Sequence, residues 1–230
     1  MITKEYSKRS QFFTGHVPLL LAEIMRTKDW QSCLEMGCGD GSLVRALDDQ
    51  GYLTGKTAYA MDISRERMGL VRDAGTAIMG VVGDVSATPV QDESVDLIIT
   101  SQVIEHVEDD GEMVSEMHRL LRKDGVAYIS TIFKKWYGWY FYRCNGRWTI
   151  DPTHVREYSE DSQLITKLED TGFSVSVNQK SLDGRPVMDA VLRRLGAGRG
   201  VYKNRFLRSL RSIEMPIPGY YIWEIVCHKK

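Results

Sequence analysis

The stretch Leu34–Gly41 reads LEMGCGDG and follows a short apolar run that begins at Ser32. Glycine at positions 37, 39 and 41 lets the backbone turn sharply and approach a ligand closely. A helical pattern follows and ends near Gly51, so we predict a strand, a glycine loop and a helix in that order. Amides at the start of such a helix favour an anionic group. Nicotinamide-binding folds use similar loops, so the loop alone leaves the ligand open.

Two aspartates follow the next two predicted strands. Asp62 comes directly after the run 57–61, and Asp84 follows the run 78–82. The carboxyl ends of parallel strands form the edge of the sheet where ligands bind. A carboxylate at Asp62 can accept two hydrogen bonds from a ribose diol, and one at Asp84 can accept from an adenine amino group. The loop and the two acids together predict a nucleoside site, although either aspartate alone is equally typical of a helix cap or a turn.

The rest of the chain continues to alternate short apolar runs with amphipathic helical patterns. Further strands are expected over 95–100, 126–132, 173–177 and 220–227. This alternation is typical of a parallel sheet covered by helices. We therefore predict an α/β fold, a Rossmann-like seven-stranded sheet with helices on both faces, and one domain over residues 1–230.

Composition excludes several classes of protein. Hydrophobic residues make up 43% of the chain and charged residues 27%, with a net charge of −1, so neither a disordered chain nor a generally basic nucleic-acid binder is expected. No apolar run is long enough for a membrane span, and no secretion signal is recognised, so we expect a cytoplasmic location. The cysteines are scattered and are expected to be reduced thiols: Cys33, Cys38, Cys144 and Cys227.

Two segments interrupt the alternation, and both are predicted to lie at the carboxyl edge of the sheet. Residues 134–158 include a dense aromatic block with an Asn-Gly turn, and residues 181–219 include a basic stretch over 192–212 that has no acid. We predict that these insertions cap the site and bind the acceptor, with Trp136 and Tyr140 in contact with it. The basic stretch could bind an acidic group on the acceptor or an anionic membrane surface. The alternative is that it forms a helix face exposed to solvent. The oligomeric state stays open.

At this point the sequence resembles the class I S-adenosylmethionine-dependent methyltransferases. The resemblance rests on Leu34–Gly41, Asp62, the pair 83–84 and the stretch 96–107, and it covers roughly Ser32 to Ile132 plus the last two strands. It implies that strand seven is antiparallel between strands five and six, and that the glycine loop faces the methionine part of S-adenosylmethionine. The residues then expected to bind the cofactor are Glu35, Gly37, Gly39, Gly41, Asp62, Ile63, Asp84, Val85, Ser101 and Gln102.

Two further stretches indicate where the chemistry occurs. The run 104–107 resembles that of ubiquinone-pathway O-methyltransferases, some of which bind a divalent metal through a Glu three residues before a Glu-His pair. Gln102 occupies that earlier position here and is a poorer ligand, so we predict no metal. His106 and His154 follow strands four and five and are the candidate general bases, the alternative being structural imidazoles. Arg156 is the candidate for orienting the acceptor.

The predicted function is transfer of a methyl group to an oxygen, rather than a nitrogen or carbon, of a small or lipid-like acceptor. A nicotinamide-dependent oxidoreductase is the first alternative, but it expects a glycine at position 42, where this chain has Ser42. A second alternative is a non-catalytic module that binds a cofactor or a partner. Nucleic acid is a weaker candidate substrate, because no recognisable reader motif accompanies the basic residues.

Overall fold

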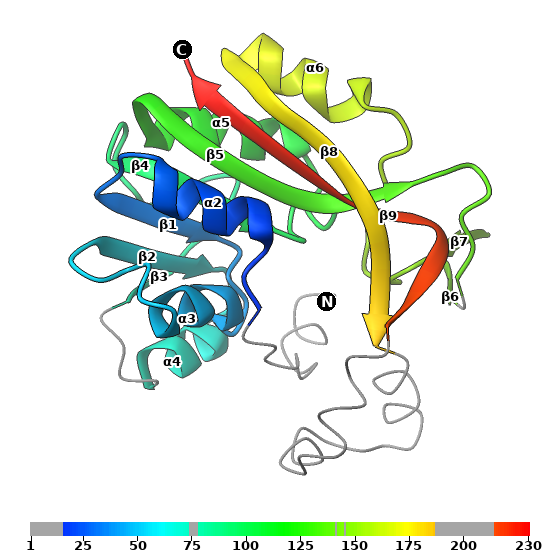
Figure 1. Ribbon diagram of the computed structural model, residues 1–230, viewed down its shortest axis with the longest axis horizontal. Coiled ribbons are helices and arrows are strands. Elements are labelled where there is room, and N and C mark those ends of the chain that lie inside the picture. Colours follow the sequence, from blue (N-terminus) through cyan, green and yellow to red (C-terminus); the bar gives the residue numbers. More distant parts are fainter. Residues whose placement is uncertain (1–15, 74–77, 141, 145, 187–213) are drawn as a thin grey trace.

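The protein is described by a computed structural model that places residues 16–73, 78–140, 142–144, 146–186 and 214–230. The strands of its main sheet are β1 (Ser32–Met36), β2 (Thr57–Asp62), β3 (Met79–Val82), β4 (Val95–Ser101), β5 (Leu121–Lys134), β8 (Phe173–Pro186) and β9 (Glu214–Lys229). Their order is β3-β2-β1-β4-β5-β9-β8 (Figure 1). The strands from β3 to β5 are parallel, and β9 is antiparallel to both β5 and β8. This topology confirms the predicted fold class.

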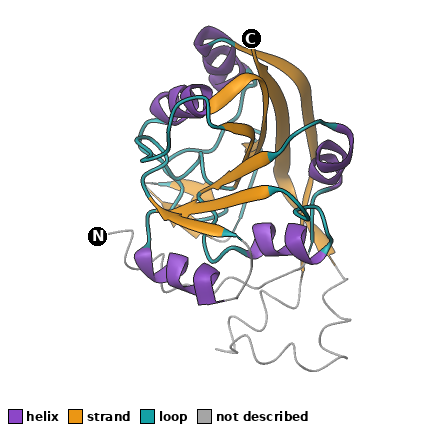
Figure 2. Ribbon diagram, turned by 90° about the vertical axis from the view of Figure 1, so that its left-hand side faces the viewer, coloured by secondary structure: helices purple, strands orange, loops and turns teal. Residues whose placement is uncertain are grey.

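Helices cover both faces of the sheet (Figure 2). The described helices are α2 (Leu19–Thr27), α3 (Ser42–Asp49), α4 (Arg65–Asp73), α5 (Asp110–Leu120) and α6 (Ser162–Thr171). One core contains apolar residues of α2, α3 and α4, and the other contains those of α5 and α6. Cys33 belongs to the first core and its neighbour Leu34 to the second, because successive side chains of a strand point to opposite faces. All five residues of β1 are buried, as expected for a central parallel strand.

The segment 134–158 runs along the end of β5 and the start of β9. It contains a small second sheet, the hairpin β6 (Tyr142–Cys144) and β7 (Arg147–Thr149), with Gly146 in the turn at a φ of 77°. The Lys135 amide donates to the Gly219 carbonyl at 2.8 Å, and the Trp139 amide donates to that of Pro218 at 3.2 Å. These bonds place the segment at the carboxyl edge of the sheet, as predicted.

The predicted limits of the second insertion are wrong. Residues 181–186 continue β8 and residues 214–219 begin β9, and Leu182 pairs there with Tyr221. Both β8 and β9 therefore extend beyond the residues whose apolar alternation predicted them. Their backbones continue to pair there, although the side chains show no clear alternation. The remaining part of the insertion, including the basic stretch 192–212, lies outside the described residues.

None of the helices in the described ranges is both long and apolar enough to cross a membrane. The cytoplasmic location stays a prediction.

The partly buried carboxylate of Asp96 links β4, which carries it, to β1 and β5 at the start of β1. Asp96 on β4 accepts hydrogen bonds from the Gln31 and Ser32 amides at 2.9 and 2.8 Å, and it also binds the Arg122 guanidinium at 2.7 Å. Partial burial alone would raise the pKa of Asp96, but the hydrogen bonds from Gln31, Arg122 and Ser32 outweigh it and lower this pKa from 3.8 to about 2. The ionised carboxylate is therefore the form that the fold stabilises.

Asp96→Asn is expected to destabilise the protein at pH 6 by about 1–3 kcal/mol, since an amide leaves some of these donors unpaired. A carboxyl group with a lowered pKa contributes stability above its unfolded pKa of 3.8 and loses it as the pH falls towards 2. Urea unfolding of the wild type and the variant between pH 6 and pH 2 tests this. Asp49→Asn, on the exposed end of α3, is the control. A stability difference that stayed constant down to pH 2 would contradict the assignment.

Candidate functional site

The glycine loop is tightly packed, and its glycines are required by geometry. Gly37, Gly39 and Gly41 have φ angles of 75°, 58° and 74°, in the left-handed region that side chains disfavour. A Cβ atom at Gly37 would lie 2.6 Å from both γ-carbons of Val103, and one at Gly41 would lie 2.8 Å from Val71. The loop therefore lies close against the segment that follows β4, with no room for a side chain.

Two buried carboxyl groups support this loop. Glu35 accepts a hydrogen bond from the Val44 amide at 3.0 Å, and burial is the main cause that raises its pKa to about 8. Asp62 accepts from the Gly39 amide at 3.0 Å and from the Ser64 amide at 2.8 Å. Asp62 thus ties the glycine loop to the end of β2, a structural role that the sequence did not reveal. Each carboxylate oxygen can accept more than one hydrogen bond, so the ribose role of Asp62 stays open as a prediction.

The residues that are predicted to bind adenine make fewer contacts with one another than those of the glycine loop. Asp84 is exposed and accepts a hydrogen bond from the Ser86 amide at 2.9 Å, which is the turn role considered as its alternative. Val85 is buried in the core near the α5 and α6 face. Ile63 is 56% exposed although it directly follows the buried Asp62. The contact of Asp84 with adenine stays a prediction.

The end of β4 is strained at the residue expected beside the methyl donor. Gln102 has a φ of 57°, uncommon for a residue with a side chain, and its amide donates to the Ser130 carbonyl at 2.8 Å. Its side-chain nitrogen is buried and has no hydrogen-bond partner among the described residues. Ser101 is the last residue of β4 and pairs with Ser130. A glycine cradle, a buried acid and an unpaired donor at one edge fit a ligand such as S-adenosylmethionine.

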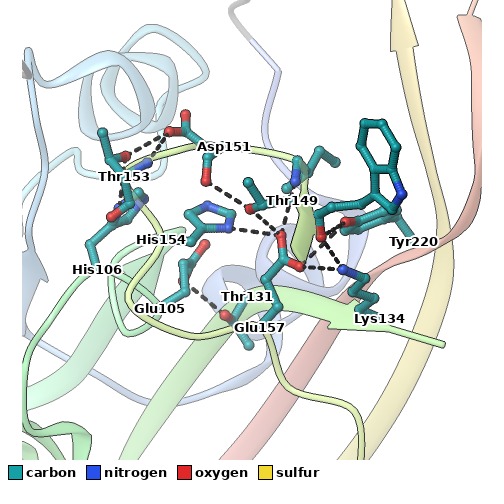
Figure 3. Close-up of polar contacts among 12 residues, drawn as sticks. Glu105, His106, Thr131, Lys134, Thr149, Asp151, Thr153, His154, Glu157 and Tyr220 are labelled. Carbon is teal, nitrogen blue, oxygen red and sulfur yellow. Dashed lines mark hydrogen bonds and ion pairs between the residues drawn. The ribbon is translucent and has the colours of Figure 1, made fainter. Parts of the chain in front are cut away.

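Two histidines follow β4 and β5 and contact each other at the same edge. The rings of His106 and His154 lie edge to face with centroids 4.7 Å apart (Figure 3). Glu105 lies beside them and is fully buried; its Oε2 accepts a hydrogen bond from Thr131 at 2.8 Å, whereas its Oε1 has no partner among the described residues. One donor atom from each of Glu105, His106 and His154 falls within 4.8 Å of the others. Sequence analysis considered Glu105 only as part of the Glu-His pair and did not assign it to the site.

A second set of polar groups fixes the orientation of the two rings. Glu157 lies 3.4 Å from Nδ1 of His154 and also accepts from Thr149 at 2.7 Å and from Lys134 at 3.0 Å. Burial alone would raise the pKa of Glu157, but these hydrogen bonds outweigh it and lower the pKa to about 2, so Glu157 is ionised. Nδ1 of His106 lies 3.2 Å from the Thr153 carbonyl oxygen. Burial, together with the charge of His154, lowers the pKa of His106 to about 4.

Glu157 was missed by sequence reasoning, although a signal was present. It stands three residues after His154, and the two side chains contact each other across the turn that 151–157 forms.

Arg156 has a structural role that the sequence did not reveal. Its guanidinium donates to the backbone carbonyls of Ile104, Val107 and Glu108 at 3.0, 2.7 and 2.6 Å, and its Nε lies 3.7 Å from Asp110. These contacts hold the loop that carries Glu105 and His106. The contact of Arg156 with an acceptor stays a prediction.

The aromatic candidates differ in their surroundings. Trp136 is 93% exposed, and its ring lies edge to face with that of Tyr137. Tyr140 is half-buried against the cluster of Ile132, Ile150, Ile217 and Tyr220. Their contact with an acceptor stays a prediction.

Comparison with known proteins agrees with these observations. Residues 34–129 match a family model described as a methyltransferase domain. A probable S-adenosylmethionine-dependent methyltransferase of Mycolicibacterium smegmatis is 32% identical over 143 residues, which are 62% of this chain and 51% of that protein. Over residues 34–129 the chain thus resembles the S-adenosylmethionine-dependent methyltransferases. This chain spans about half the length of the curated relatives it matches.

A second relative and two solved structures extend the comparison. A malonyl-[acyl-carrier protein] O-methyltransferase of Pseudescherichia vulneris is 26% identical over 129 residues, which are 56% of this chain and 49% of that protein. The YcgJ protein of Bacillus subtilis has a TM-score of 0.65 at 16% identity, covering 92% of this chain and 97% of its own. The [4+2]-cyclase SpnF also has a TM-score of 0.65 at 16% identity, covering 91% of this chain and 78% of its own. At such identities the structures show the shared fold alone.

Gly37→Ala is expected to weaken binding of S-adenosylhomocysteine and to destabilise the protein, because the new methyl group would displace Val103. Gly55→Ala is the matched control, since Gly55 has a similar φ of 72° but nothing within 4 Å of its missing Cβ. The free energy of unfolding of the control variant should fall by only about 1–2 kcal/mol, the cost of a side chain in the left-handed region. Urea unfolding and calorimetric titration of both variants test this, and equal losses in the two variants would show that the approach of Val103 is unimportant.

Proposed function

We propose that the protein transfers the methyl group of S-adenosylmethionine to an oxygen of a small or lipid-like acceptor. The observation that carries this proposal is the meeting of the glycine loop, Asp62 and the His106–His154 pair at one edge of the sheet. Methyl transfer needs a site that holds the cofactor and a second group that handles the proton of the acceptor. The match to a methyltransferase domain supports this reaction over hydride transfer to a nicotinamide.

The cofactor would be held along the carboxyl ends of β1, β2 and β4. Backbone of the glycine loop would contact its methionine part, Asp62 its ribose, and Asp84 with Val85 and Ile63 its adenine. Ser101 and Gln102 would flank the methyl donor, and the buried side-chain nitrogen of Gln102 offers an unused hydrogen bond there. The bound sulfonium group supplies an electrophilic methyl carbon. The chain must therefore align the acceptor oxygen and exclude water.

The choice of oxygen rests on the histidine pair and on the name of one relative. As the acceptor oxygen bonds to the methyl carbon, the bond from carbon to sulfur breaks and its electron pair stays on sulfur. The acceptor proton must leave, and a neutral imidazole of His106 or His154 can take it. The Pseudescherichia relative is named as an O-methyltransferase, which supports oxygen as the acceptor atom.

The acceptor would lie beneath the aromatic segment 134–158. Trp139 and Trp148 are 43% and 37% exposed and lie edge to face with centroids 5.7 Å apart. Such partly exposed rings suit a flat or apolar acceptor. The basic stretch 192–212 would add attraction for an acidic group or for an anionic membrane surface.

Asp62→Ala is expected to weaken the binding of S-adenosylhomocysteine by about 1–3 kcal/mol, because it strands a ribose hydroxyl and frees the Gly39 amide. Isothermal titration calorimetry measures the change, with Asp49→Ala as a control for loss of a carboxylate on α3. Asp84→Ala, measured in parallel, tests the adenine contact. Unchanged affinity in Asp62→Ala would remove this residue from the cofactor site.

Labelled S-adenosylmethionine tests the reaction itself. Incubation with matched hydroxyl, carboxyl and amine acceptors should place the labelled methyl group on oxygen, and His106→Ala or His154→Ala should lower the turnover about 10²–10⁴-fold. The affinity for S-adenosylhomocysteine should stay the same in both variants. A methyl group found only on nitrogen, or turnover unaffected in both variants, would overturn the proposed role of the pair.

A further inference from the structure

We propose that an exposed aromatic surface beside the end of β5 docks on an anionic lipid bilayer. The aromatic surface consists of Trp136, Tyr137, Tyr221 and Leu182, of which Trp136 is 93% exposed, Leu182 59% and Tyr137 48%. It lies on the side of the sheet that carries β9 and β8, opposite the side that carries β3 (Figure 1). The inference rests on the proposed function only in the lipid-like nature of the acceptor, and it uses none of the residues of the basic stretch 192–212.

Direct contacts connect the side chains of the aromatic surface. The ring of Trp136 lies edge to face with that of Tyr137, whose hydroxyl lies 3.4 Å from the hydroxyl of Tyr221. Leu182 of β8 is directly opposite Tyr221 of β9 in the antiparallel pair, so their side chains point to the same face of the sheet. Residues from three separate parts of the chain therefore form one continuous surface.

Glycine fixes the segment that carries the two exposed rings to β9. The Lys135 amide donates to the Gly219 carbonyl at 2.8 Å, and a Cβ atom at Gly219 would lie 2.5 Å from the Cα atom of Gly138. Gly219 also has a φ of 74°, in the left-handed region. The backbone beneath Trp136 and Tyr137 is thus packed against the sheet, so docking requires little further ordering of the chain.

The composition of the aromatic surface suits the boundary between water and lipid. Single exposed apolar side chains are common, but a group of contacting ones marks an interaction site. Tryptophan and tyrosine are enriched where a membrane meets water, because their rings are apolar and their polar atoms reach the head groups. Leu182 adds an aliphatic side chain that a bilayer would remove from water. These side chains favour a bilayer as the occupant.

The charges around the aromatic surface favour anionic lipids. The segment 134–150 contains four Lys or Arg residues and no Asp or Glu. Lys134 is balanced by Glu157 at 3.0 Å, whereas Lys135 and Arg147 are exposed. Basic side chains beside an apolar surface are attracted to the negative charge of an anionic leaflet.

The same charges disfavour a second copy of the chain as the occupant. Asp161 is paired with Lys180 at 2.7 Å, and Asp183, which follows Leu182, is buried. Two copies of the aromatic surface would therefore bring basic residues against basic residues, and like charges across an interface are unfavourable. A bilayer with anionic head groups meets no such repulsion.

Docking would bring the bilayer close to the proposed bases. Nζ of Lys134 donates both to the Trp148 carbonyl and to the carboxylate of Glu157, which in turn contacts His154 (Figure 3). These contacts connect the aromatic segment to the histidine pair. Trp136, which is predicted to contact the acceptor, would then contact the bilayer that contains it.

Co-sedimentation of the full chain with lipid vesicles tests the apolar part of the proposal. The wild type should bind vesicles of phosphatidylcholine mixed with phosphatidylglycerol, and Trp136→Ala should bind them about 10-fold more weakly. Leu70→Ala is the control, because Leu70 of α4 is 51% exposed and lies on the side of the sheet that carries β3. Its affinity for the vesicles should equal that of the wild type. Both Trp136 and Leu70 are exposed, so neither change should unfold the protein.

A second pair of variants tests the charge. Lys135→Glu should lower the affinity for the mixed vesicles about 10-fold at low salt and less at high salt, because salt screens the attraction. Lys123→Glu makes the same change in net charge at the opposite end of β5 and should have little effect. Vesicles of phosphatidylcholine alone should bind the wild type at least about 10-fold more weakly than the mixed vesicles.

Three results would overturn the proposal. The first is no saturable binding of the wild type to the mixed vesicles. The second is binding that Trp136→Ala and Lys135→Glu leave equal to that of their controls, which would assign the contact to another part of the chain. The third is a dimer in sedimentation velocity that Trp136→Ala dissociates, which would assign the aromatic surface to a second copy.

Assays of methyl transfer on the wild type separate this inference from the proposed function. Binding to the mixed vesicles without transfer to any oxygen acceptor would support docking and reject the proposed function. Transfer to a soluble oxygen acceptor without binding to the vesicles would support the proposed function and reject docking.

Discussion

The hydrogen bond from the Gly39 amide to the buried carboxylate of Asp62 is the interaction on which the site depends. It joins the loop after β1 to the end of β2, so the two neighbouring strands end in a fixed geometry. The loop can take this position only because Gly37 presents no side chain to Val103. One buried acid and one close approach therefore set the position of the glycine loop relative to the end of β4.

A second set of bonds carries that geometry to the histidines. The carbonyl of Glu105 accepts hydrogen bonds from the amides of Val155 and Arg156 at 2.9 and 3.2 Å, and the Arg156 guanidinium holds the carbonyls around it. These hydrogen bonds join the loop after β4 to the segment after β5, and the rings of His106 and His154 contact each other between the two.

Much of this arrangement could be predicted from the sequence, for a physical reason. Parallel strands end at one edge, so residues that follow β1, β2, β4 and β5 must gather there, and the meeting of His106 with His154 follows. The contacts of Arg156 could not be predicted. Its acceptors are backbone carbonyls about fifty positions away, and backbone carbonyls leave no signal in the sequence because every residue has one. The continuation of β8 to Pro186 was missed because strand pairing there depends on backbone bonds to β9 and not on apolar alternation.

Glu105 is the residue that a purely structural account explains least. A carboxyl group with an unpaired buried oxygen costs stability, and burial raises its pKa, so an apolar residue would pack there more favourably. The hydrogen bond from Thr131 satisfies one oxygen only. One oxygen of Glu105 lies within 4.8 Å of a ring nitrogen of each histidine. In the proposed methyl transfer to oxygen, a proton taken up by either imidazole would place a positive charge beside this carboxyl group.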